Sequence, residues 1–562
     1  MDALGSICRE CAPPEGHLEP CRPPGLPPCP VHDRLPSCPP GALRRWQSHA
    51  LDTLRGWDGG PFLISAAPGA GKTRPALELA RRLLEERAIS HLVVLCPTTP
   101  LTRQWAAAAA RLGLHLAPDA ETPRPPADFH GVAVTYARVA GGAERWRRTV
   151  SPQTLVIADE AHHLGEELAW GTGFARAFAR CPHQLLLSGT PFRSDATPIP
   201  GVCYDAQGLC EPDVSYSYAE AVKDGICRPV GFVTYDGALS WRSGDDVIES
   251  SFDTVLTPRE ASRRYRTAIS TELPHGLARI VREAHTRLQA IRAGGHRDAG
   301  ALAVAADGAH ARQVARLITE VTGRSPVVVL HTEARAAAKL AAFGASTDPW
   351  LVAVNMVSEG VDIPRLRVGV YATAAKTPLI FRQIVGRFVR TIGGRPADAS
   401  WLYLPADPVL RRHAAEVESE LRHALRREEA GGELDAAPER PASDRPEVVE
   451  FVPLSADVAP QMTLFGTPGA GAARPPQAPV AHAAAVAPDP PAVDVPAFER
   501  RALLRDKRHR LVSDLRRREG RSHREINAWL NREVGVTRVQ DATLEQLERS
   551  ITVLVGRLSP RR

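Results

Sequence analysis

The sequence predicts an α/β fold with two tandem domains, each built on a doubly wound parallel sheet, and a small helical module after them. Short apolar runs alternate with helical segments rich in Ala, Arg and Leu from residue 41 onward, and the same rhythm returns after residue 226. The runs are apolar throughout rather than at every second residue, which is typical of parallel strands that helices cover on both faces. From about residue 430 the composition changes to Ala, Pro and Gly, and a further helical pattern follows near the C-terminus.

The first domain is expected over residues 41–225. Its strands are predicted at the runs PFLIS, HLVVLC, GVAVT, TLVIA and QLLLS, which begin at residues 61, 91, 131, 154 and 184. The second domain is expected over residues 226–429. Its strands are predicted at ALAVA, VVVL, LVAV, RVGVY and WLYL, which begin at residues 301, 327, 351, 367 and 401.

Three further segments differ from these domains in composition. Residues 1–40 are Pro-rich and lack periodicity, which indicates an irregular leader. Residues 430–497 contain too few large apolar residues to bury a core, which predicts a disordered linker. Residues 498–562 are expected to form a basic helical module, because apolar residues recur there at helical spacing: Ile526, Trp529, Leu530 and Val534.

Composition and charge narrow the class of protein. With 562 residues, 43% of them hydrophobic, the chain is long enough for two or three domains. No run approaches the roughly 18 consecutive apolar residues of a membrane helix, and no signal-like segment is readable, so a cytoplasmic, nucleoid-associated protein is expected. The net charge of +6 is modest, but residues 500–524 hold eleven Arg or Lys and only three Asp or Glu. This segment favours contact with a polyanion.

A phosphate-binding loop is predicted at residues 66–73, AAPGAGKT, between the strand PFLIS and a helical segment. Gly69 and Gly71 would let backbone N–H groups converge on phosphate oxygens, with Ala67, Pro68 and Ala70 completing the loop. Lys72 would place its charge on the β and γ phosphates of ATP, and the Thr73 hydroxyl would bind Mg²⁺. Ala66 stands where the general pattern has Gly, so the pattern is missed by one methyl group.

An acidic pair follows the strand TLVIA, in the sequence Asp159-Glu160-Ala161-His162. Ligands of open α/β sheets bind at the carboxyl ends of the strands, where this pair is expected to lie. Asp159 would hold Mg²⁺, and Glu160 would polarise the water that attacks the γ-phosphate. A phosphate loop and an acidic pair in one domain therefore predict an enzyme that hydrolyses a nucleoside triphosphate.

Together these motifs resemble the DEAD/DEAH-box helicases of superfamily 2, in the branch of restriction-enzyme motor subunits and excision-repair helicases. The resemblance covers about residues 41–405 and implies two RecA-like domains. Arg44-x-Trp46-Gln47 resembles the motif whose Gln contacts the nucleotide base. Residues 97–105, PTTPLTRQW, resemble the motif that lies along a nucleic-acid backbone, and residues 188–191, SGTP, match the motif that couples the nucleotide site to the strand site.

In the second domain, residues 355–364 (NMVSEGVDIP) and 383–390 (QIVGRFVR) match the two motifs that face the first domain's nucleotide. The resemblance implies that Arg390 is an arginine finger. It also implies that further residues lie near the phosphates or the cleft between the domains: Gln383, Arg387, Glu359, Gly360 and Asp362.

Two weaker signals each leave two interpretations open. Leader cysteines Cys8, Cys11, Cys21 and Cys29 offer zinc ligands, but their Pro-rich surroundings lack the hairpin or helix that usually positions such ligands, which favours a leader without metal. Residues 461–465, QMTLF, resemble the peptide by which bacterial repair and replication proteins dock on the sliding clamp, with Gln461, Leu464 and Phe465 as anchors. The alternative is chance composition of the linker.

The leading prediction is an ATP-dependent DNA helicase or translocase that acts in repair, recombination, mobile-element maintenance or defence. An RNA helicase is the enzymatic alternative, because no residue reads the 2′-hydroxyl decisively. A clamp-tethered DNA-binding protein with a vestigial ATPase is the alternative of another class. The presence of all four of Lys72, Asp159, Glu160 and Arg390 argues against it.

Overall fold

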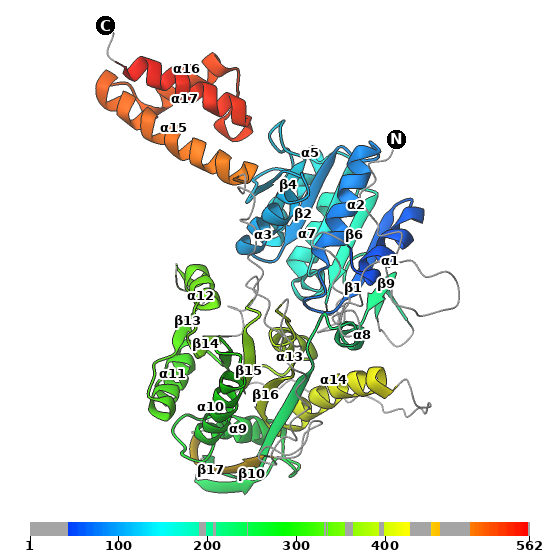
Figure 1. Ribbon diagram of the computed structural model, residues 1–562, viewed down its shortest axis with the longest axis vertical. Coiled ribbons are helices and arrows are strands. Elements are labelled where there is room, and N and C mark those ends of the chain that lie inside the picture. The colour runs from blue at the N-terminus through cyan, green and yellow to red at the C-terminus, as the bar shows by residue number, and fades with distance from the viewer. Residues whose placement is uncertain are drawn as a thin grey trace, which may run out of the picture. The chain divides into compact units, whose positions relative to one another are not determined.

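The computed structural model describes residues 43–189, 198–205, 210–243, 245–330, 333, 335–354, 363–392, 398–426, 451–460 and 495–559. These residues divide into two compact units, each with its own sheet (Figure 1). One unit takes the described residues of 43–65, 71–215 and 473–562, and the other takes those of 66–70 and 216–472.

Seven strands form the first sheet within the described residues. They are β1 (Gly60–Ala66), β2 (His91–Cys96), β3 (Leu116–Pro118), β4 (Gly131–Thr135), β5 (Thr154–Asp159), β6 (His183–Ser188) and β9 (Val214–Tyr216). Their order across the sheet is β3-β4-β2-β5-β6-β1-β9, and the neighbours from β3 to β1 are parallel. Parallel neighbours require crossover connections, which helices supply.

Helices cover both faces of the first sheet. They are α1 (Arg45–Thr53), α2 (Thr73–Glu85), α3 (Thr99–Ala110), α4 (Tyr136–Ala140), α5 (Ala143–Thr149), α6 (His163–Glu166) and α7 (Leu168–Phe178). Val93 and Leu95 of β2 belong to a core cluster with residues of α4, α5 and α7. Leu92 and Val94 point to the opposite face and are also fully buried. The continuous apolar runs of the sequence therefore reflect burial on both faces.

Three neighbouring strands of the first sheet end at the same edge. Asp159, the last residue of β5, pairs with Leu187 of β6, and Ser188 at the end of β6 pairs with Ser65 of β1. Because the three strands are parallel, the segments that follow them leave the sheet side by side. This edge receives the phosphate loop after β1 and the acidic pair at the end of β5.

Eight strands form the second sheet within the described residues. They are β10 (Val230–Ser243), β11 (Asp246–Ser250), β12 (Gly300–Ala305), β13 (Val327–Val329), β14 (Trp350–Val354), β15 (Leu366–Ala372), β16 (Ser400–Pro405) and β17 (Phe451–Pro460). The order β10-β16-β15-β12-β14-β13 is parallel throughout. The two remaining strands, β11 and β17, both pair with β10 in antiparallel fashion, so this sheet is mixed at one edge.

Helices alternate with the strands of the second sheet. They are α8 (Tyr218–Lys223), α9 (Pro258–Ala268), α10 (Leu277–Ala293), α11 (Gly308–Thr322), α12 (Ala336–Ala345), α13 (Pro378–Val385) and α14 (Pro408–Arg426). Local sequence sets their ends, as α11 illustrates. Asp307 accepts hydrogen bonds from the N–H groups of Ala309 and His310, and the helix stops at Gly323, whose φ is 71°. The predicted fold class, two tandem RecA-like α/β sheets, is confirmed.

The prediction of a disordered linker over residues 430–497 is wrong at β17. Residues 451–460 pair with Tyr235–Ser243 of β10, with a register shift between Ser240 and Trp241. Ala456 and Val458 are buried while their neighbours are exposed, so the segment has the period of a half-buried strand. The average composition of residues 430–497 does not reveal so short an alternating segment. The rest of the predicted linker, 430–450 and 461–494, and the leader lie outside the described residues.

Three helices form the C-terminal part of the described chain: α15 (Ala497–Glu519), α16 (His523–Val534) and α17 (Leu544–Leu558) (Figure 1). Ser522 and Thr543 begin α16 and α17 with capping boxes. Their buried core consists of Val512, Leu515, Ile526, Leu530 and Leu554, with Trp529 packed against it. The expected helical module is thus confirmed. None of the described helices is long and apolar enough to cross a membrane.

The alternating burial along β17 allows its contribution to stability to be tested. Val458 is 2% exposed, so Val458→Asp would bury a carboxylate without a partner and cost about 3 kcal/mol. The midpoint of the thermal transition of the full chain should fall by roughly 6–12 °C, and proteolysis after Pro460 should become faster. Ala459→Asp is the matched control, because Ala459 is exposed on the same strand. Equal midpoints for the two variants would mean that β17 does not stabilise the sheet.

Candidate functional site

The phosphate loop, residues 66–73, has the backbone that its glycines predict. Gly69 and Gly71 have φ values of 84° and 87°, in the left-handed region that residues with a Cβ rarely adopt. The N–H of Ala70 donates to Ala67 O at 3.0 Å, which closes a tight turn around Pro68. α2 begins at Thr73, immediately after Lys72. A glycine turn that leads into a helix N-terminus is suited to bind an anion.

Gln47 lies against this loop. Its Nε2 donates to Gly71 O at 2.9 Å, and its Oε1 accepts a bond of 2.9 Å from the N–H of Arg44. A Cβ on Gly71 would lie only 3.0 Å from Gln47 Nε2, so the glycine permits the close approach. The structure therefore brings Gln47 to the loop, while the base contact that the resemblance implies for it stays a prediction.

Lys72 brings the phosphate loop and the acidic pair, Asp159 and Glu160, together. Lys72 Nζ lies 3.8 Å from Glu160 Oε1, and the lysine side chain is 9% exposed. Glu160 has a φ of 51°, an uncommon backbone conformation for a residue other than Gly, Asn or Asp. Strained backbone of this kind persists where surrounding structure holds it, often at functional sites. Two motifs almost ninety residues apart in the sequence thus form one cluster.

The two carboxyl groups of the acidic pair differ in pKa. Burial raises the pKa of Asp159, and the negative charge of Glu160 raises it further. For Glu160, burial acts in the same direction, but Lys72, the nearby His162 and His163 and the N–H of Gly189 outweigh it and lower the pKa. The pair therefore holds one firmly ionised carboxylate beside one that an additional cation would stabilise in its ionised form.

Two aromatic side chains hold Asp159 from opposite ends. Trp105 Nε1 of α3 donates to Asp159 Oδ2 at 2.7 Å, and the Tyr136 hydroxyl of α4 donates to Asp159 O at 2.7 Å. Both aromatic residues are buried. The sequence identified Trp105 only as part of a strand-contacting motif and gave no sign of Tyr136. Helical spacing reveals which face of α3 is buried, but it does not reveal which polar atom that face meets.

His162 connects the acidic pair to the motif that begins at Ser188. His162 Nδ1 lies 3.0 Å from Ser188 Oγ and 3.6 Å from Glu160 Oε2, and both His162 and Ser188 are buried. His163 packs its ring on that of His162, with ring centres 4.4 Å apart. The coupling that the resemblance implies for Ser188 therefore has a physical route, through one imidazole to the carboxylate of Glu160.

The residues at this edge fit Mg²⁺ in the way that nucleotide sites usually do. Among the described residues, no group of three or more His, Cys, Asp or Glu could hold a metal alone. Mg²⁺ is commonly bound by one or two protein oxygens together with waters and substrate phosphates. The acidic pair sets two carboxylates against the one charge of Lys72, so a divalent cation suits Asp159. Thr73, at the start of α2, has the hydroxyl for a second ligand.

In the second unit, Gln383 lies in α13, and Arg387 and Arg390 follow the end of that helix at Val385. Arg390 forms an isolated antiparallel bridge with Cys227, and the N–H of Arg228 donates to Val389 O at 2.8 Å. This pairing fixes the backbone of Arg390 against the segment that leads into β10. The roles that the resemblance gives these three residues stay predictions.

Several residues singled out by the sequence lie outside the described residues. They are Thr190 and Pro191, the second-domain residues Glu359, Gly360 and Asp362, the linker residues Gln461, Leu464 and Phe465, and the leader cysteines Cys8, Cys11, Cys21 and Cys29.

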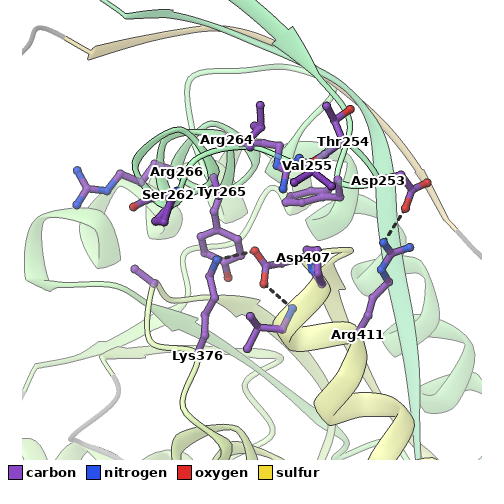
Figure 2. Close-up of a pocket in the computed structure, with 17 residues that line it drawn as sticks. Asp253, Thr254, Val255, Ser262, Arg264, Tyr265, Arg266, Lys376, Asp407 and Arg411 are labelled. Atoms are coloured by element: carbon purple, nitrogen blue, oxygen red, sulfur yellow. Dashed lines mark hydrogen bonds and ion pairs between the residues drawn. The ribbon is translucent and has the colours of Figure 1, made fainter. Parts of the chain in front are cut away.

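A separate pocket of about 470 Å³ lies at the carboxyl ends of β15 and β16, lined also by α9 and the start of α14 (Figure 2). Its charged groups are largely paired with each other. Lys376 Nζ lies 2.6 Å from Asp407 Oδ2, and Arg411 Nη2 lies 2.6 Å from Asp253 Oδ1. None of the site residues predicted from the sequence lines this pocket. It is therefore distinct from the cluster around Lys72.

Comparison with known proteins agrees with this geometry. Residues 41–193 match the family model of the type III restriction enzyme, res subunit. The matched segment holds the phosphate loop and the acidic pair. With two sheets of RecA-like order, it defines a protein related to the superfamily 2 helicases.

Mycobacterial relatives refine the assignment. The chain is 41% identical over 451 residues to the uncharacterized protein Rv2917 of Mycobacterium tuberculosis (strain ATCC 25618 / H37Rv), over 77% of this chain and 73% of the relative. It is 38% identical over 449 residues to ML1624 of Mycobacterium leprae (strain TN), over 77% of this chain and 74% of the relative. The chain belongs to the family of these mycobacterial proteins.

Solved structures are more distant. A fragment assigned to an HsdR subunit of a type I restriction enzyme from Vibrio vulnificus has 17% sequence identity and a TM-score of 0.47, over 66% of this chain and 65% of that one. Dbp5 of S. cerevisiae, bound to RNA and ADP BeF3, has 14% identity and a TM-score of 0.42, over 68% of this chain and 88% of that one.

Proposed function

We propose that this protein hydrolyses ATP with Mg²⁺ and couples hydrolysis to movement on DNA, as a helicase or translocase. The observation that carries the proposal is the 3.8 Å approach of Lys72 Nζ to Glu160 Oε1, beside the buried Asp159. A loop suited to phosphate, a cation and two carboxylates then occupy one sheet edge. In-line phosphoryl transfer to water uses groups of these kinds together with Mg²⁺.

Each residue has a distinct part in the proposed reaction. Lys72 neutralises charge on the β and γ phosphates, while the loop N–H groups orient them. Glu160, whose pKa is lowered by Lys72 and its histidine neighbours despite burial, is ionised at neutral pH and accepts a hydrogen bond from the attacking water. Thr73 and Asp159 would hold Mg²⁺, which when bound neutralises developing charge on the phosphate oxygens. His162 carries changes at Glu160 to Ser188.

DNA is the favoured polymer for two reasons. The family model that matches residues 41–193 is that of a restriction-enzyme subunit, and restriction enzymes act on DNA. The C-terminal module also carries exposed cations. Five basic residues between 500 and 524 are exposed and form neither an ion pair nor a side-chain hydrogen bond with any described residue: Arg505, Lys507, Arg510, Arg516 and Arg524. An RNA helicase remains the alternative outcome of the assays below.

Hydrolysis is tested by removing one group at a time. Lys72→Ala and Glu160→Gln should each lower the ATPase rate by at least about a hundredfold, because the removed groups stabilise the transition state. Arg390→Ala should spare nucleotide binding but slow hydrolysis by about a thousandfold, as expected for an arginine finger. The measurements are steady-state hydrolysis and binding of a fluorescent nucleotide, with single-stranded DNA, duplex DNA, forked DNA and RNA compared as activators.

Matched controls for these variants lie on the surface. Lys223→Ala and Glu272→Gln alter exposed residues and should leave hydrolysis unchanged. Wild-type activity in both Lys72→Ala and Glu160→Gln would contradict the site assignment. Stronger activation by RNA than by any DNA would replace the DNA motor with an RNA helicase.

The C-terminal module should contribute to DNA affinity through its exposed cations. Replacing Arg505, Arg510 and Arg516 with Ala should weaken binding and lower the slope of log affinity against log salt by about 0.9 for each duplex phosphate that the protein no longer neutralises. Deleting residues 498–562 should lower this slope by at least the same amount. The control triple variant replaces Arg500, Arg517 and Arg557, which already form ion pairs with Glu548, Asp514 and Glu519. If the variant of Arg505, Arg510 and Arg516 has the same slope as wild type, the exposed cations form a solvated surface only.

The linker peptide is proposed to dock on a replication sliding clamp. β17 ends at Pro460, and Gln461 is the next residue in the sequence. Leu464 and Phe465 would fill an apolar pocket with roughly micromolar affinity, since an extended peptide loses entropy on binding. Replacing both with Ala in the full chain should abolish clamp binding in a calorimetric titration without changing DNA-stimulated hydrolysis. If wild type binds no better than this variant, the resemblance is accidental.

A further inference from the structure

The Asp159 carboxylate depends on a residue that lies outside both the phosphate loop and the acidic pair. Trp105 is 2% exposed, Asp159 is 8% exposed, and the indole N–H donates to Asp159 Oδ2 at 2.7 Å. A hydrogen bond to a carboxylate in such a buried place is strong, and its removal leaves a charged oxygen unsatisfied. The direction of the Asp159 side chain is therefore set in part by the position of α3.

The backbone of Asp159 is fixed independently of α3. It lies in the ladder between β5 and β6, and its carbonyl accepts a 2.7 Å bond from the Tyr136 hydroxyl at the start of α4. A small displacement of α3 would thus turn or release the carboxylate without moving the strand. Trp105 is the adjustable contact of the two.

The outer ends of α3 and α4 share a second link, Asp119. Thr102 Oγ1 donates to Asp119 Oδ1 at 3.0 Å, and Arg103 Nε lies 3.4 Å from Asp119 Oδ2. From α4, Arg138 Nη1 donates to Asp119 O at 3.0 Å. Asp119 itself has a φ of 57°. The two helices are therefore tied on the inside by Asp159 and on the outside by Asp119.

The outer link is accessible, and its contact with Arg103 is ionic, whereas Arg138 meets the carbonyl oxygen of Asp119. The Arg103 side chain is 67% exposed, and Arg138 is exposed beside it. An exposed ion pair of this kind is weak, so a polyanion that binds the two arginines can compete with Asp119 for them. Such competition would act on α3 and α4 at the same time.

We propose that Trp105 is a positioning residue. It orients the Asp159 carboxylate for Mg²⁺, and through α3 it links that carboxylate to the surface formed by Arg103, Asp119 and Arg138, where a nucleic-acid backbone binds. The inference rests on the proposed function and specifies how the same site is regulated. When a nucleic-acid backbone binds this outer surface, the hydrogen bond from Trp105 to Asp159 changes. The metal affinity of the site then changes with it.

The first test measures metal affinity rather than activity. Trp105→Phe keeps most of the ring and removes the N–H donor. Binding of Mn²⁺ with a non-hydrolysable ATP analogue, followed by electron paramagnetic resonance on the full chain, should weaken by about tenfold or more, as for other groups that orient a metal ligand. Excess Mg²⁺ should restore hydrolysis. Trp146→Phe is the control, because Trp146 is also fully buried but belongs to a core cluster that does not include Trp105, where it packs on Phe178.

The second test observes the indole directly. The ¹⁵N-indole resonance of Trp105, identified by its absence in Trp105→Phe, should shift when single-stranded DNA is added without nucleotide. Arg103→Ala combined with Arg138→Ala should remove this shift. Arg111→Ala is the matched control, because Arg111 is exposed at the opposite end of α3.

The outcomes separate this inference from the proposed function. If wild type binds no Mn²⁺ with the nucleotide, both are overturned. If wild type binds it and Trp105→Phe binds it equally well, only the positioning role is overturned. A Trp105 resonance that does not respond to DNA, or that still responds in the Arg103 and Arg138 double variant, overturns the link to the outer surface.

Discussion

The burial of Asp159 at the end of β5, beside the Glu160 side chain that is 34% exposed, is the constraint on which the candidate site depends. Desolvation opposes the charge of an isolated carboxylate in such a place and raises its pKa. Here neighbouring side chains supply a positive charge and a hydrogen-bond donor in place of water. Lys72 provides a charge 3.8 Å from Glu160, and Trp105 provides a donor 2.7 Å from an oxygen of Asp159. The phosphate loop, α3 and the end of β5 therefore stabilise one another.

The same constraint explains why the site is predictable in some parts and hidden in others. The sequence predicted five of the seven strands of the first sheet, because each of the five is an apolar run, and the motifs follow them at once. It missed β3 and β9, which have three residues each. HLVVLC and GVAVT coincide with β2 and β4, and the other three predicted strands differ by no more than one residue at either end. Local burial thus determines the strands, and the strand ends place Lys72, Asp159 and Glu160.

What the sequence could not provide are contacts between segments that are far apart. Trp105 lies 54 residues from its partner Asp159, and β17 pairs with a strand more than two hundred residues before it. Neither pairing has a local signature. β17 was also missed because the residues around it in the sequence include few large apolar side chains. The average composition of that region therefore does not reveal the strand. Pro453 and Pro460 also weaken the strand signal.

The charge of the C-terminal module illustrates how structure revises an expectation made from composition. Eleven basic residues lie between 500 and 524, but two of them are buried. Arg501 donates to Ala542 O and Gln540 O, and Arg508 donates to the side chains of Asn527 and Asn531. These guanidinium groups hold the three helices together and are not available to a polyanion.

Others of the eleven are engaged at the surface. Arg500, Arg517 and Arg521 form ion pairs with described residues, and Arg518 donates to Leu558 O. A salt dependence calculated from all eleven charges would therefore be too steep, because each neutralised phosphate contributes about 0.9 to the slope on duplex DNA. Five exposed cations of this segment can contact phosphate without giving up a partner among the described residues. Some basic residues of this segment therefore hold the three helices together, and others keep their charge on the surface.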